Sequence, residues 1–457
     1  MTVPSSDFDT DVIVLGGGAC GMMTALRTAR NPEVSVLVFE KNTRQGCNTQ
    51  FSSGSLAAGG TRFQEAAGID DSPQRHAHDI LEVSHDLISK DLVRAVCEAA
   101  PQYVEWLADD LNYPIELGVD MVRAGQSVPR LHTDIGRHGG SRLVQYLRQA
   151  VDSAGNIGFV DNTPGVSLLY DGSGVRRRVA GAVVSEPSGP QKIRSRHVVL
   201  ATDGFGNNTE LLQRYCPDAV DAFYGGASTS TGDGINMGLD AGAALGNMTG
   251  YLGHGMVVAG VGTRLNPNLP FLGAAMVDES GQRFCDERAQ GYSKLAGIIR
   301  KQPGGRVALI WDEPAMTKAR HSELMRESEA ANAYKRFQSV QEMALSLGIP
   351  VGSLTKTMAT FKAQSDLVER SDERLKAPLY AAWITHGILT TQGGLMIDVK
   401  GRVRRPDDSV VTGLSAGGGA AMGISGSSSD GYSSGNGLLA AMGLGWIIGN
   451  RLAQGLE

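Results

Sequence analysis

DVIVLGGGACGMMTALRTARNPEVSVLVFEK, residues 11–41, is the stretch that decides the fold. Its residues 12–15 are apolar and rich in β-branched side chains, as in a strand buried on both faces, and they run directly into the pattern Gly16-x-Gly18-x-x-Gly21. A helical pattern follows, and then a second strand at residues 34–39 that ends at Glu40. This order of strand, glycines, helix, strand and acid is typical of a dinucleotide-binding βαβ unit.

The glycines and the acid of this stretch have separate expected tasks. Gly16 would allow the tight turn after the strand, Gly18 would let a pyrophosphate approach the backbone, and Gly21 would let the helix pack closely on the strand. Glu40, about 20 residues after Gly21, is placed to accept hydrogen bonds from ribose hydroxyls. A lone glycine pattern can be a simple turn, but strands and acid in register favour a nucleotide site.

Length and charge narrow the class of protein. With 457 residues, the chain is long enough for two or three domains and a large core. It has 42 basic and 48 acidic residues, a formal net charge of -6, and no basic block. Nucleic acid and anionic membrane surfaces are therefore not expected partners.

The termini and the cysteines exclude other classes. Residues 1–10 lack the basic start and apolar core of a secretory signal, and the apolar residues 437–449 are too few and too glycine-rich for a membrane span. We therefore expect a cytoplasmic protein without a transmembrane segment, in which residues 437–449 form a buried helix. The 5 cysteines include no C-x-x-C pair, so no disulfide framework, metal site, iron–sulfur cluster or attached haem is expected.

Further glycine clusters lie far along the chain. The strand-like residues 198–201 run into the turn at 202–206, residues 231–234 read TGDG, and GLSAGGG at 413–419 precedes DGYSSGNG at 430–437. Residues 41–55 form a polar loop rich in hydroxyl groups, where nicotinamide enzymes usually continue the βαβ sheet. These features predict one large cofactor touched from both ends of the chain, a flavin rather than a nicotinamide.

Several motifs occur in a characteristic order. The glycine fingerprint, EK-x-x-x-x-G at 40–46, ATDGFG at 201–206, TGDG, GGLMID at 393–398 and GLSAGG at 413–418 together resemble the flavoprotein superfamily of fumarate reductases, succinate dehydrogenase flavoprotein subunits and ketosteroid dehydrogenases. The resemblance extends over nearly the whole chain. It implies an α/β fold: a Rossmann-type FAD-binding domain, discontinuous in sequence, with an inserted α+β capping domain. The expected ranges are 1–250 and 362–457 for the FAD-binding domain and 251–361 for the capping domain.

The resemblance also implies how FAD is held. No histidine stands in the loop after Glu40, where the respiratory subunits carry one for covalent attachment, so the FAD is expected to be non-covalent. Two positions depart from the family pattern: Asp203 stands where a second glycine is common, and Gly419 stands where an acid is common. The expected cofactor-binding residues are Gly16, Gly18, Ala19, Cys20, Gly21, Glu40, Lys41, Asn48, Thr49, Ser53, Gly54, Ala201, Thr202, Asp203, Gly204, Asp233, Gly418, Asn436, Gly437, Leu438 and Leu439.

The site pattern bears on the substrate. The fumarate reductase branch binds dicarboxylates with arginines and histidines, whereas the ketosteroid branch polarises a ketone with tyrosines and a backbone N–H. Here Gly291 stands in the place of the catalytic arginine, residues 387–392 lack the histidine pair, and Ser434 replaces the arginine of the G-Y-N-R motif. The sequence therefore favours the ketone branch.

Tyr432 is the first candidate for catalysis, because its hydroxyl and the backbone N–H of Asn436 could both polarise a ketone oxygen. Tyr292 is the candidate base for the α-proton, although the ketosteroid enzymes place their base one residue nearer the glutamate. His132, a third catalytic candidate, and His254 match substrate-side histidines of the fumarate branch. Alternatively, Tyr432 only lines the pocket, Tyr292 caps a core, and His132 ties down a loop. The expected substrate-binding residues are His132, His254, Gly393, Gly394 and Asn436, with no metal ligand.

The sequence thus predicts an FAD-dependent oxidoreductase that acts on CH–CH bonds of a small molecule. The expected reaction is α,β-dehydrogenation (desaturation) of a cyclic ketone, such as an oxocyclohexane carboxylate or a steroid-like ring, by α-proton abstraction and hydride transfer to flavin N5. One alternative is an enoate reductase acting on a carboxylate such as fumarate or urocanate, with Arg288 as proton donor; another is a flavin-binding electron-transfer subunit. Oxygen, a quinone or an electron carrier remain open as electron acceptor, as do the reaction direction and the oligomeric state.

Overall fold

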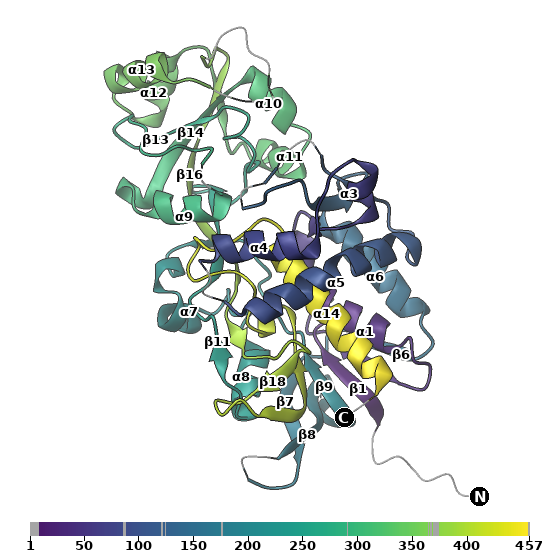
Figure 1. Ribbon diagram of the computed structural model, residues 1–457. Helices are drawn as coiled ribbons and strands as arrows, with labels where there is room; N and C mark the ends of the chain where they lie inside the picture. The colour runs from purple at the N-terminus through teal and green to yellow at the C-terminus, as the bar shows by residue number, and fades with distance from the viewer. Residues whose placement is uncertain are drawn as a thin grey trace, which may run out of the picture. The chain divides into compact units, whose positions relative to one another are not determined.

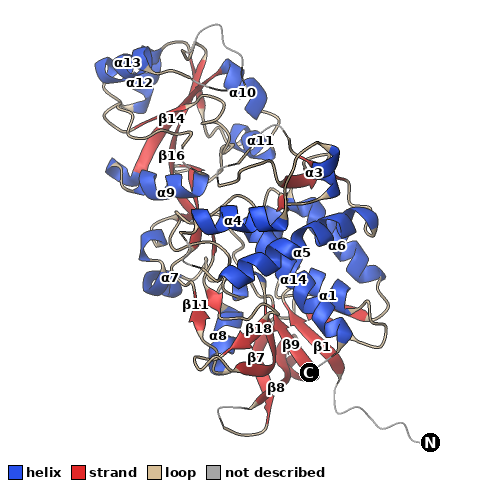
Figure 2. Ribbon diagram, viewed as in Figure 1, coloured by secondary structure: helices blue, strands red, loops and turns tan. Residues whose placement is uncertain are grey.

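The computed structural model describes residues 9–455, except 86–87, 120–121, 124, 175–176, 290, 364, 366–367 and 369–373. The chain divides into two units (Figure 1). Unit 1 comprises Met1–Pro217, Gly226–Tyr251 and Thr390–Glu457, and unit 2 comprises Asp218–Gly225 and Leu252–Leu389. Helices and strands occur in both, so the protein is of the mixed α/β class (Figure 2).

The largest sheet of unit 1 has β1 (Thr10–Leu15) at its centre. Strands β2 (Val36–Phe39) and β9 (Gly189–Leu200) pair with it in parallel, with Val12 opposite Val36 and Leu15 opposite Leu200. On the far side of β9, β19 (Val410–Ala416) is also parallel. Because parallel strands end at the same edge of a sheet, the glycine-rich turns after β1, β9 and β19 leave the sheet together. The sheet is completed by β6 (Ile157–Val160), β7 (Gly165–Asp171), β8 (Arg178–Glu186) and β18 (Arg402–Arg404).

The first helix, α1 (Ala19–Thr28), connects β1 to β2 and packs against the last helix, α14 (Asn436–Gln454). Glycines in α14 make this contact close: a Cβ on Gly445 would lie 2.7 Å from the Cys20 oxygen, and one on Gly449 would lie 2.5 Å from Arg27 Cβ. Residues 437–449 thus belong to a largely buried helix, as the sequence predicted. Among the described residues, no helix combines the length and apolar composition that crossing a membrane requires.

The other elements of unit 1 surround this layer. A three-stranded sheet is formed by β3 (Leu56–Ala57), β5 (Leu131–Asp134) and β4 (Ile115–Leu117), and a two-stranded one by β11 (Leu245–Gly246) and β17 (Gly394–Leu395). The remaining helices are α2 (Asn48–Phe51), α3 (Arg62–Ala66), α4 (Pro73–Val83), α5 (Lys90–Asp109), α6 (Gly140–Ser153), α7 (Thr209–Tyr215) and α8 (Asp233–Asp240).

Unit 2 is organised by one long strand, β16 (Leu379–Thr391). It pairs in antiparallel fashion with β14 (Arg306–Asp312) and β15 (Lys335–Phe337), and in parallel with β10 (Phe223–Tyr224). The sheet also includes β12 (Tyr251–Val258) and β13 (Ala275–Val277). Its helices are α9 (Tyr292–Arg300), α10 (Glu313–Ala319), α11 (Glu323–Ala330), α12 (Val340–Leu347) and α13 (Val351–Thr360).

The boundaries of unit 2 differ from the expected range 251–361. Its start at Leu252 is close to the expected position, but the unit continues to Leu389 and also includes Asp218–Gly225. The reason is β16: residues 379–385 pair with β14 along its whole length, so this strand belongs to the same sheet. The second boundary therefore lies at 389 and not at 361.

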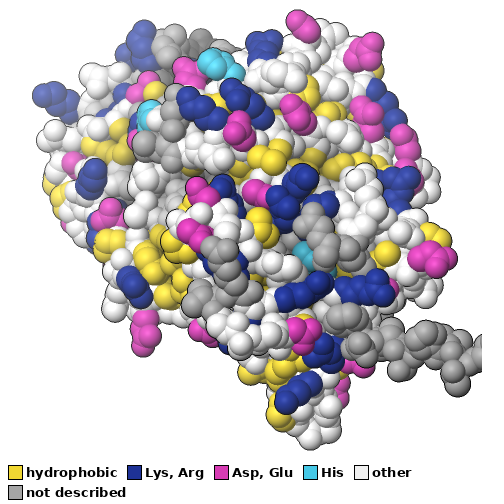
Figure 3. Space-filling view, turned by 60° about the horizontal axis from the view of Figure 1, so that its bottom comes forward, with side chains coloured by type: hydrophobic (Ala, Val, Ile, Leu, Met, Phe, Trp, Pro, Cys, Tyr) yellow, Lys and Arg dark blue, Asp and Glu magenta, His cyan; other side chains and the backbone are white. Residues whose placement is uncertain are grey.

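Charged side chains of both signs are mixed over the face shown in Figure 3. The mixture agrees with the nearly balanced count of 42 basic and 48 acidic residues. Interspersed charges keep a surface hydrated without creating the single-sign field that attracts a polyanion.

Candidate active site

The turn between β1 and α1 depends on its glycines for different reasons. A Cβ on Gly16, whose φ is +108, would lie 2.2 Å from the Ala201 oxygen, and one on Gly21 would lie 1.9 Å from the Gly16 oxygen. A Cβ on Gly18, in contrast, would have Thr49 Oγ1 at 3.8 Å as its nearest neighbour. Gly16 and Gly21 are therefore required by the fold itself, whereas Gly18 borders space that a cofactor could fill.

The N-terminus of α1 can attract an anion. Its N-cap is Gly18, and within this fully described helix no side-chain cap and no acidic residue of the first turn offset the helix dipole. Thr49 Oγ1 accepts a hydrogen bond from the Ala19 N–H at 3.1 Å. The helix dipole at this N-terminus therefore favours an anion, whereas the Ala19 N–H, one of the expected donors, is already bonded to Thr49.

Glu40 lies directly beside this turn. One carboxylate oxygen accepts a hydrogen bond from the Gly17 N–H at 2.7 Å, and the other accepts one from the Asn42 N–H at 2.8 Å. Because each carboxylate oxygen has two lone pairs, both can still accept a hydroxyl. Sequence reasoning missed Gly17, on which a Cβ would lie 2.6 Å from the Phe159 ring, since only packing from β6 reveals its role.

The segment after Glu40 is tied to the TGDG region by side chains. Lys41 Nζ forms an ion pair with Asp233 at 2.8 Å and donates to Thr231 Oγ1 at 2.9 Å. Asn48 donates to Ser230 Oγ at 3.2 Å, donates also to Asp203, and accepts from a backbone N–H at 2.7 Å. These contacts connect the segment after Glu40 to residues 203 and 227–233. They involve three residues expected at the cofactor, Lys41, Asn48 and Asp233.

The two residues that depart from the family pattern, Asp203 and Gly419, lie side by side. Asp203 has φ of +67, and its Oδ2 accepts a hydrogen bond from Ser230 Oγ at 2.7 Å. A Cβ on Gly419 would lie 2.4 Å from Asp203 Oδ1. It would also lie 2.5 Å from the Gly204 backbone nitrogen, so both the Asp203 carboxylate and the backbone require Gly419 to stay small.

The remaining expected cofactor residues of these turns are mostly fixed by close packing. Thr202 Oγ1 accepts from the Gly234 N–H at 3.0 Å, and a Cβ on Gly204 would lie 2.2 Å from Thr391 Oγ1. Gly54 and Gly418 have φ of +68 and +59, which glycine adopts without strain. Ser53 Oγ donates to Ser55 Oγ at 2.9 Å.

Gly393 and Gly394, expected at the substrate, are also tightly enclosed. A Cβ on Gly393 would lie 2.4 Å from Met248 Cα, and one on Gly394 would lie 2.5 Å from the Ala421 carbonyl carbon. Both glycines therefore serve the packing of unit 1.

The N-terminus of α14 holds the Tyr432 hydroxyl. The Gly437 N–H donates to the Tyr432 hydroxyl oxygen at 3.0 Å. The Asn436 N–H donates to the backbone carbonyl oxygen of Ser433 at 3.2 Å. Gly435, with φ of +91, turns the chain before the helix begins, so the Asn436 N–H is bonded within the turn; its contact with a ketone oxygen stays a prediction. Leu438 and Leu439, expected at the cofactor, direct their side chains into the core.

The side chain of Asn436 is fully buried. Its Nδ2 donates to Ser425 Oγ at 3.2 Å, and its Oδ1 has no hydrogen-bond partner among the described residues. An orphaned buried acceptor costs about 1–3 kcal/mol unless a ligand or water satisfies it. The cradle at Gly18 and this acceptor are two independent places where unit 1 fits a bound cofactor.

His132 differs from its expected role. Its Nε2 pairs with Thr61 Oγ1 at 2.9 Å and its Nδ1 with the Arg130 oxygen at 2.9 Å, so both ring nitrogens are bonded within the protein. Burial lowers the pKa of His132 to about 4 despite these carbonyl contacts. The expected catalysis and substrate contact are therefore not supported: the histidine ties β5 to β3 and α3.

In unit 2, Tyr292 is the first residue of α9 and its ring lies 5.4 Å from that of His254. His254 is buried, and its Nδ1 accepts the Met256 N–H at 3.3 Å. Burial, with the nearby Arg264 cation, lowers the pKa of His254 to about 3, so this ring is neutral. Burial also lowers the pKa of Arg264, while Glu327 and Tyr292 oppose the shift. Sequence reasoning missed Arg264 because no motif surrounds it.

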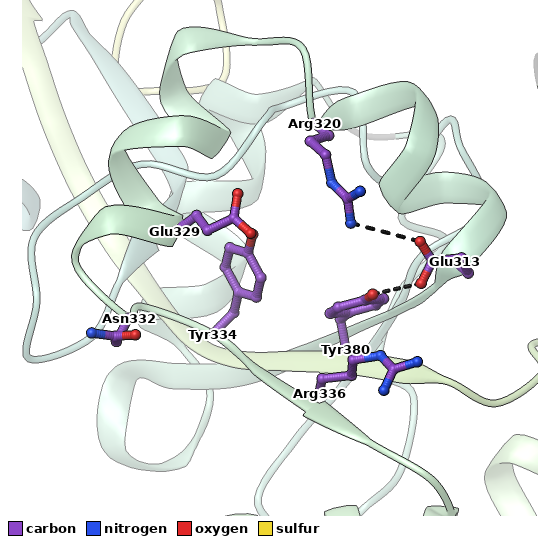
Figure 4. A pocket seen from close by; sticks show the side chains of 7 residues that line it. All are labelled: Glu313, Arg320, Glu329, Asn332, Tyr334, Arg336 and Tyr380. Carbon is purple, nitrogen blue, oxygen red and sulfur yellow. Dashed lines mark hydrogen bonds and ion pairs between the residues drawn. The ribbon is translucent and has the colours of Figure 1, made fainter.

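Unit 2 also contains a hollow of about 500 Å³ (Figure 4). Tyr380 donates its hydroxyl hydrogen to Glu313 at 2.5 Å, and Arg320 lies 3.6 Å from the other oxygen of Glu313. The lining contains two acids and two arginines, so its formal charge is balanced. None of the expected site residues lines this hollow. The lining residues are Glu313, Arg320, Glu329, Asn332, Tyr334, Arg336 and Tyr380.

Comparison with known proteins identifies the family. Residues 11–438 match the family described as FAD binding domain. The chain is 28% identical over 456 residues to a probable fumarate reductase of Shewanella frigidimarina, covering 97% of this chain and 75% of that protein. Its structure is similar to the open conformation of a flavocytochrome c3 fumarate reductase, with a TM-score of 0.80, 26% identity, and coverage of 98% and 79%.

A second structural similarity comes from the ketosteroid branch. The 3-ketosteroid delta1-dehydrogenase of Sterolibacterium denitrificans has a TM-score of 0.80 and 22% identity, with coverage of 97% of this chain and 99% of that one. At this identity the likeness concerns the fold. The chain therefore belongs to the FAD binding domain family, and it is an FAD-dependent oxidoreductase.

Proposed function

We propose that this protein catalyses α,β-dehydrogenation of a cyclic ketone, or the reverse reaction. The observation that carries the proposal is the Tyr432 hydroxyl, which accepts the Gly437 N–H at 3.0 Å at the N-terminus of α14. Bound FAD would accept or return the hydride. A cyclic ketone, such as an oxocyclohexane carboxylate or a steroid-like ring, fits a donor aimed at one carbonyl oxygen.

The chemistry of Tyr432 follows from its hydrogen bond. A phenol hydroxyl can accept one hydrogen bond and donate another, so a Tyr432 oxygen that accepts an N–H is a stronger donor to a substrate carbonyl. The N-terminus of the 19-residue α14 also favours the negative charge that develops on this oxygen. Removing one such donor typically lowers kcat about 100-fold to 1000-fold.

Tyr292 is the proposed base for the α-proton. Its ring lies 5.4 Å from His254, and the charge of Arg264 acts on both rings. A neighbouring cation favours the phenolate form that a tyrosine base requires. In this proposal unit 1 is the Rossmann-type domain, which holds the hydride-accepting FAD non-covalently. Unit 2 is the capping domain.

An enoate reductase acting on a carboxylate is the second candidate. The similarity to fumarate reductases favours it, and so does Arg264, a cation close to His254 and Tyr292. In this alternative Arg264 replaces Arg288 as the residue that holds or protonates the substrate. A flavin-binding electron-transfer subunit would have no substrate chemistry of its own.

An anaerobic absorbance titration separates these candidates. Bleaching of the flavin band by cyclohexanone, an oxocyclohexane carboxylate or a 3-ketosteroid supports the ketone reaction, and bleaching by succinate alone supports the enoate reductase. Oxidation of the dithionite-reduced protein by a cyclic enone, fumarate or urocanate tests the reverse direction. A protein that reacts with none of them fits the electron-transfer subunit.

The variant Tyr432→Phe tests the residue assignment. It should retain FAD and lose about 100-fold in kcat, because the phenyl ring keeps the packing but cannot donate. Tyr103→Phe is the matched control, since the Tyr103 hydroxyl is buried in α5 without a partner among the described residues. Unchanged turnover in Tyr432→Phe would remove this tyrosine from the mechanism.

A further inference from the structure

The turn that carries Tyr432 is fastened to a distant segment of unit 1, residues 125–127. Gln126 Nε2 donates to the backbone carbonyl oxygen of Ser434 at 3.0 Å, and Ser433 Oγ donates to the backbone carbonyl oxygen of Gly125 at 3.3 Å. A Cβ on Gly125, whose φ is +80, would lie 3.1 Å from Ser433 Oγ. The two segments are therefore in close contact across 308 residues of sequence.

Residues 125–127 are in turn held by a buried ion cluster. The Ser127 N–H donates to Asp79 at 2.7 Å, and Arg130 forms ion pairs with both Asp79 and Asp71. The side chains of Arg130 and Asp71 are 0% exposed. Burial raises the pKa of Asp79, but hydrogen bonds from Arg130 and Ser127 outweigh it and lower the pKa overall, so the carboxylate stays ionised. Buried hydrogen bonds of this kind rigidify the segments that they join.

The orientation of the Gln126 amide is fixed by its surroundings. Its Nε2 faces the Ser434 oxygen, and its Oε1 is buried without a partner among the described residues. A flipped amide would place two acceptor oxygens against each other. The Ser434 oxygen comes directly before Gly435, the N-cap of α14.

We propose that Gln126 is a positioning residue for Tyr432. Its hydrogen bond fixes the peptide before the N-cap, and that peptide sets the direction of the Gly437 N–H and of the Tyr432 hydroxyl that accepts it. The inference rests on the proposed function, in which Tyr432 donates to the substrate carbonyl. Gln126 acts through the turn without touching the reacting atoms.

The test compares Gln126→Met and Gln126→Glu with wild type, using the ketone that bleaches the flavin. Methionine has a similar size but cannot donate, so kcat should fall at least about tenfold, with FAD content unchanged and KM within about twofold. The charged form of Gln126→Glu repels the Ser434 oxygen, whereas the protonated acid can donate to it. Its kcat relative to wild type should therefore rise as the pH is lowered, which a purely structural role does not predict.

Two further variants make the outcome decisive. Gln102→Met is the matched control, because Gln102 Nε2 makes the same kind of bond, to the Glu98 oxygen at 3.0 Å, on an exposed helix surface. Ser433→Ala removes the second tie and substitutes for Gln126→Met should that protein fail to fold. If Tyr432→Phe loses turnover but the Gln126 variants and Ser433→Ala keep it within twofold, the positioning role is refuted and the proposed function stands. If Tyr432→Phe keeps its turnover, both the proposed function and the positioning role of Gln126 are refuted.

Discussion

Replacing Gly18 with alanine separates the cofactor contact from the fold. The added Cβ would have Thr49 Oγ1 as its nearest neighbour at 3.8 Å, which is ordinary van der Waals contact. The backbone there, with φ of -75 and ψ of -173, is open to alanine, and the change at this N-cap costs about 1 kcal/mol or less. The same methyl group would stand where the pyrophosphate approaches the backbone. We expect the Kd for FAD to rise about 100-fold, or about 2.8 kcal/mol.

The assay is a fluorescence titration of FAD with the deflavinated protein, together with thermal unfolding of the apoprotein by circular dichroism. Gly16→Ala is the control for a fold defect, because its Cβ would lie 2.2 Å from the Ala201 oxygen at a φ of +108. That variant should lower the Tm of the apoprotein itself, whereas Gly18→Ala should not lower it by more than a few degrees. Wild-type FAD affinity in a folded Gly18→Ala protein would refute the assignment of Gly18 to the pyrophosphate.

Three further predictions concern other residues of unit 1. Glu40→Gln should raise the Kd for FAD about tenfold, because the ribose loses a charged acceptor; an unchanged Kd in the same fluorescence titration would contradict this. Gly419→Ala should lower Tm, because the added Cβ would lie 2.4 Å from Asp203 Oδ1 and 2.5 Å from the Gly204 backbone nitrogen; the added change Asp203→Gly should not restore it, and full recovery would show that the carboxylate alone sets the limit. Because the pKa of His132 is lowered to about 4, unfolding binds a proton at this residue below the ordinary pKa of about 6.5, and His132 alone should contribute about 2 kcal/mol to the fall in stability between pH 7 and pH 5. Denaturant midpoints of the apoprotein at the two pH values should show a smaller fall in His132→Gln.

The nucleotide-binding stretch could be predicted from sequence because its determinants are local. Gly16, Gly21 and Glu40 lie within one βαβ unit, and the contacts of Gly21 and Glu40 are made within it, whereas Gly16 also meets Ala201 from the turn after β9. Their spacing therefore carries enough information to place them. The family resemblance added the cofactor, and the match over residues 11–438 supports it.

Features that depend on distant contacts were less predictable. His132 stands at the position of a substrate-side histidine, yet its role is decided by Thr61, 71 residues away, and by two main-chain oxygens. Arg264 acts on His254 and Tyr292 only because β12 and α9 bring them together. The boundary of unit 2 was placed too early because the pairing of β16 with β14 joins strands far apart in sequence. None of these contacts leaves a periodic or spaced pattern in the chain.

The turn before α14 shows how local backbone geometry decides which groups a site offers. A spacing of four residues from Tyr432 selects Asn436, but Gly435 adopts φ of +91, and the Asn436 N–H is used within the turn by the Ser433 oxygen. The next N–H, that of Gly437, therefore meets the Tyr432 hydroxyl. The missing side chain at Gly437 matters as well, because a Cβ there would lie 3.3 Å from that hydroxyl oxygen. The N-terminus of α14, the Gly437 N–H and the Tyr432 phenol thus form one hydrogen-bonded group, whose geometry depends on Gly435 and Gly437. The spacing of the polar residues alone could not predict this geometry.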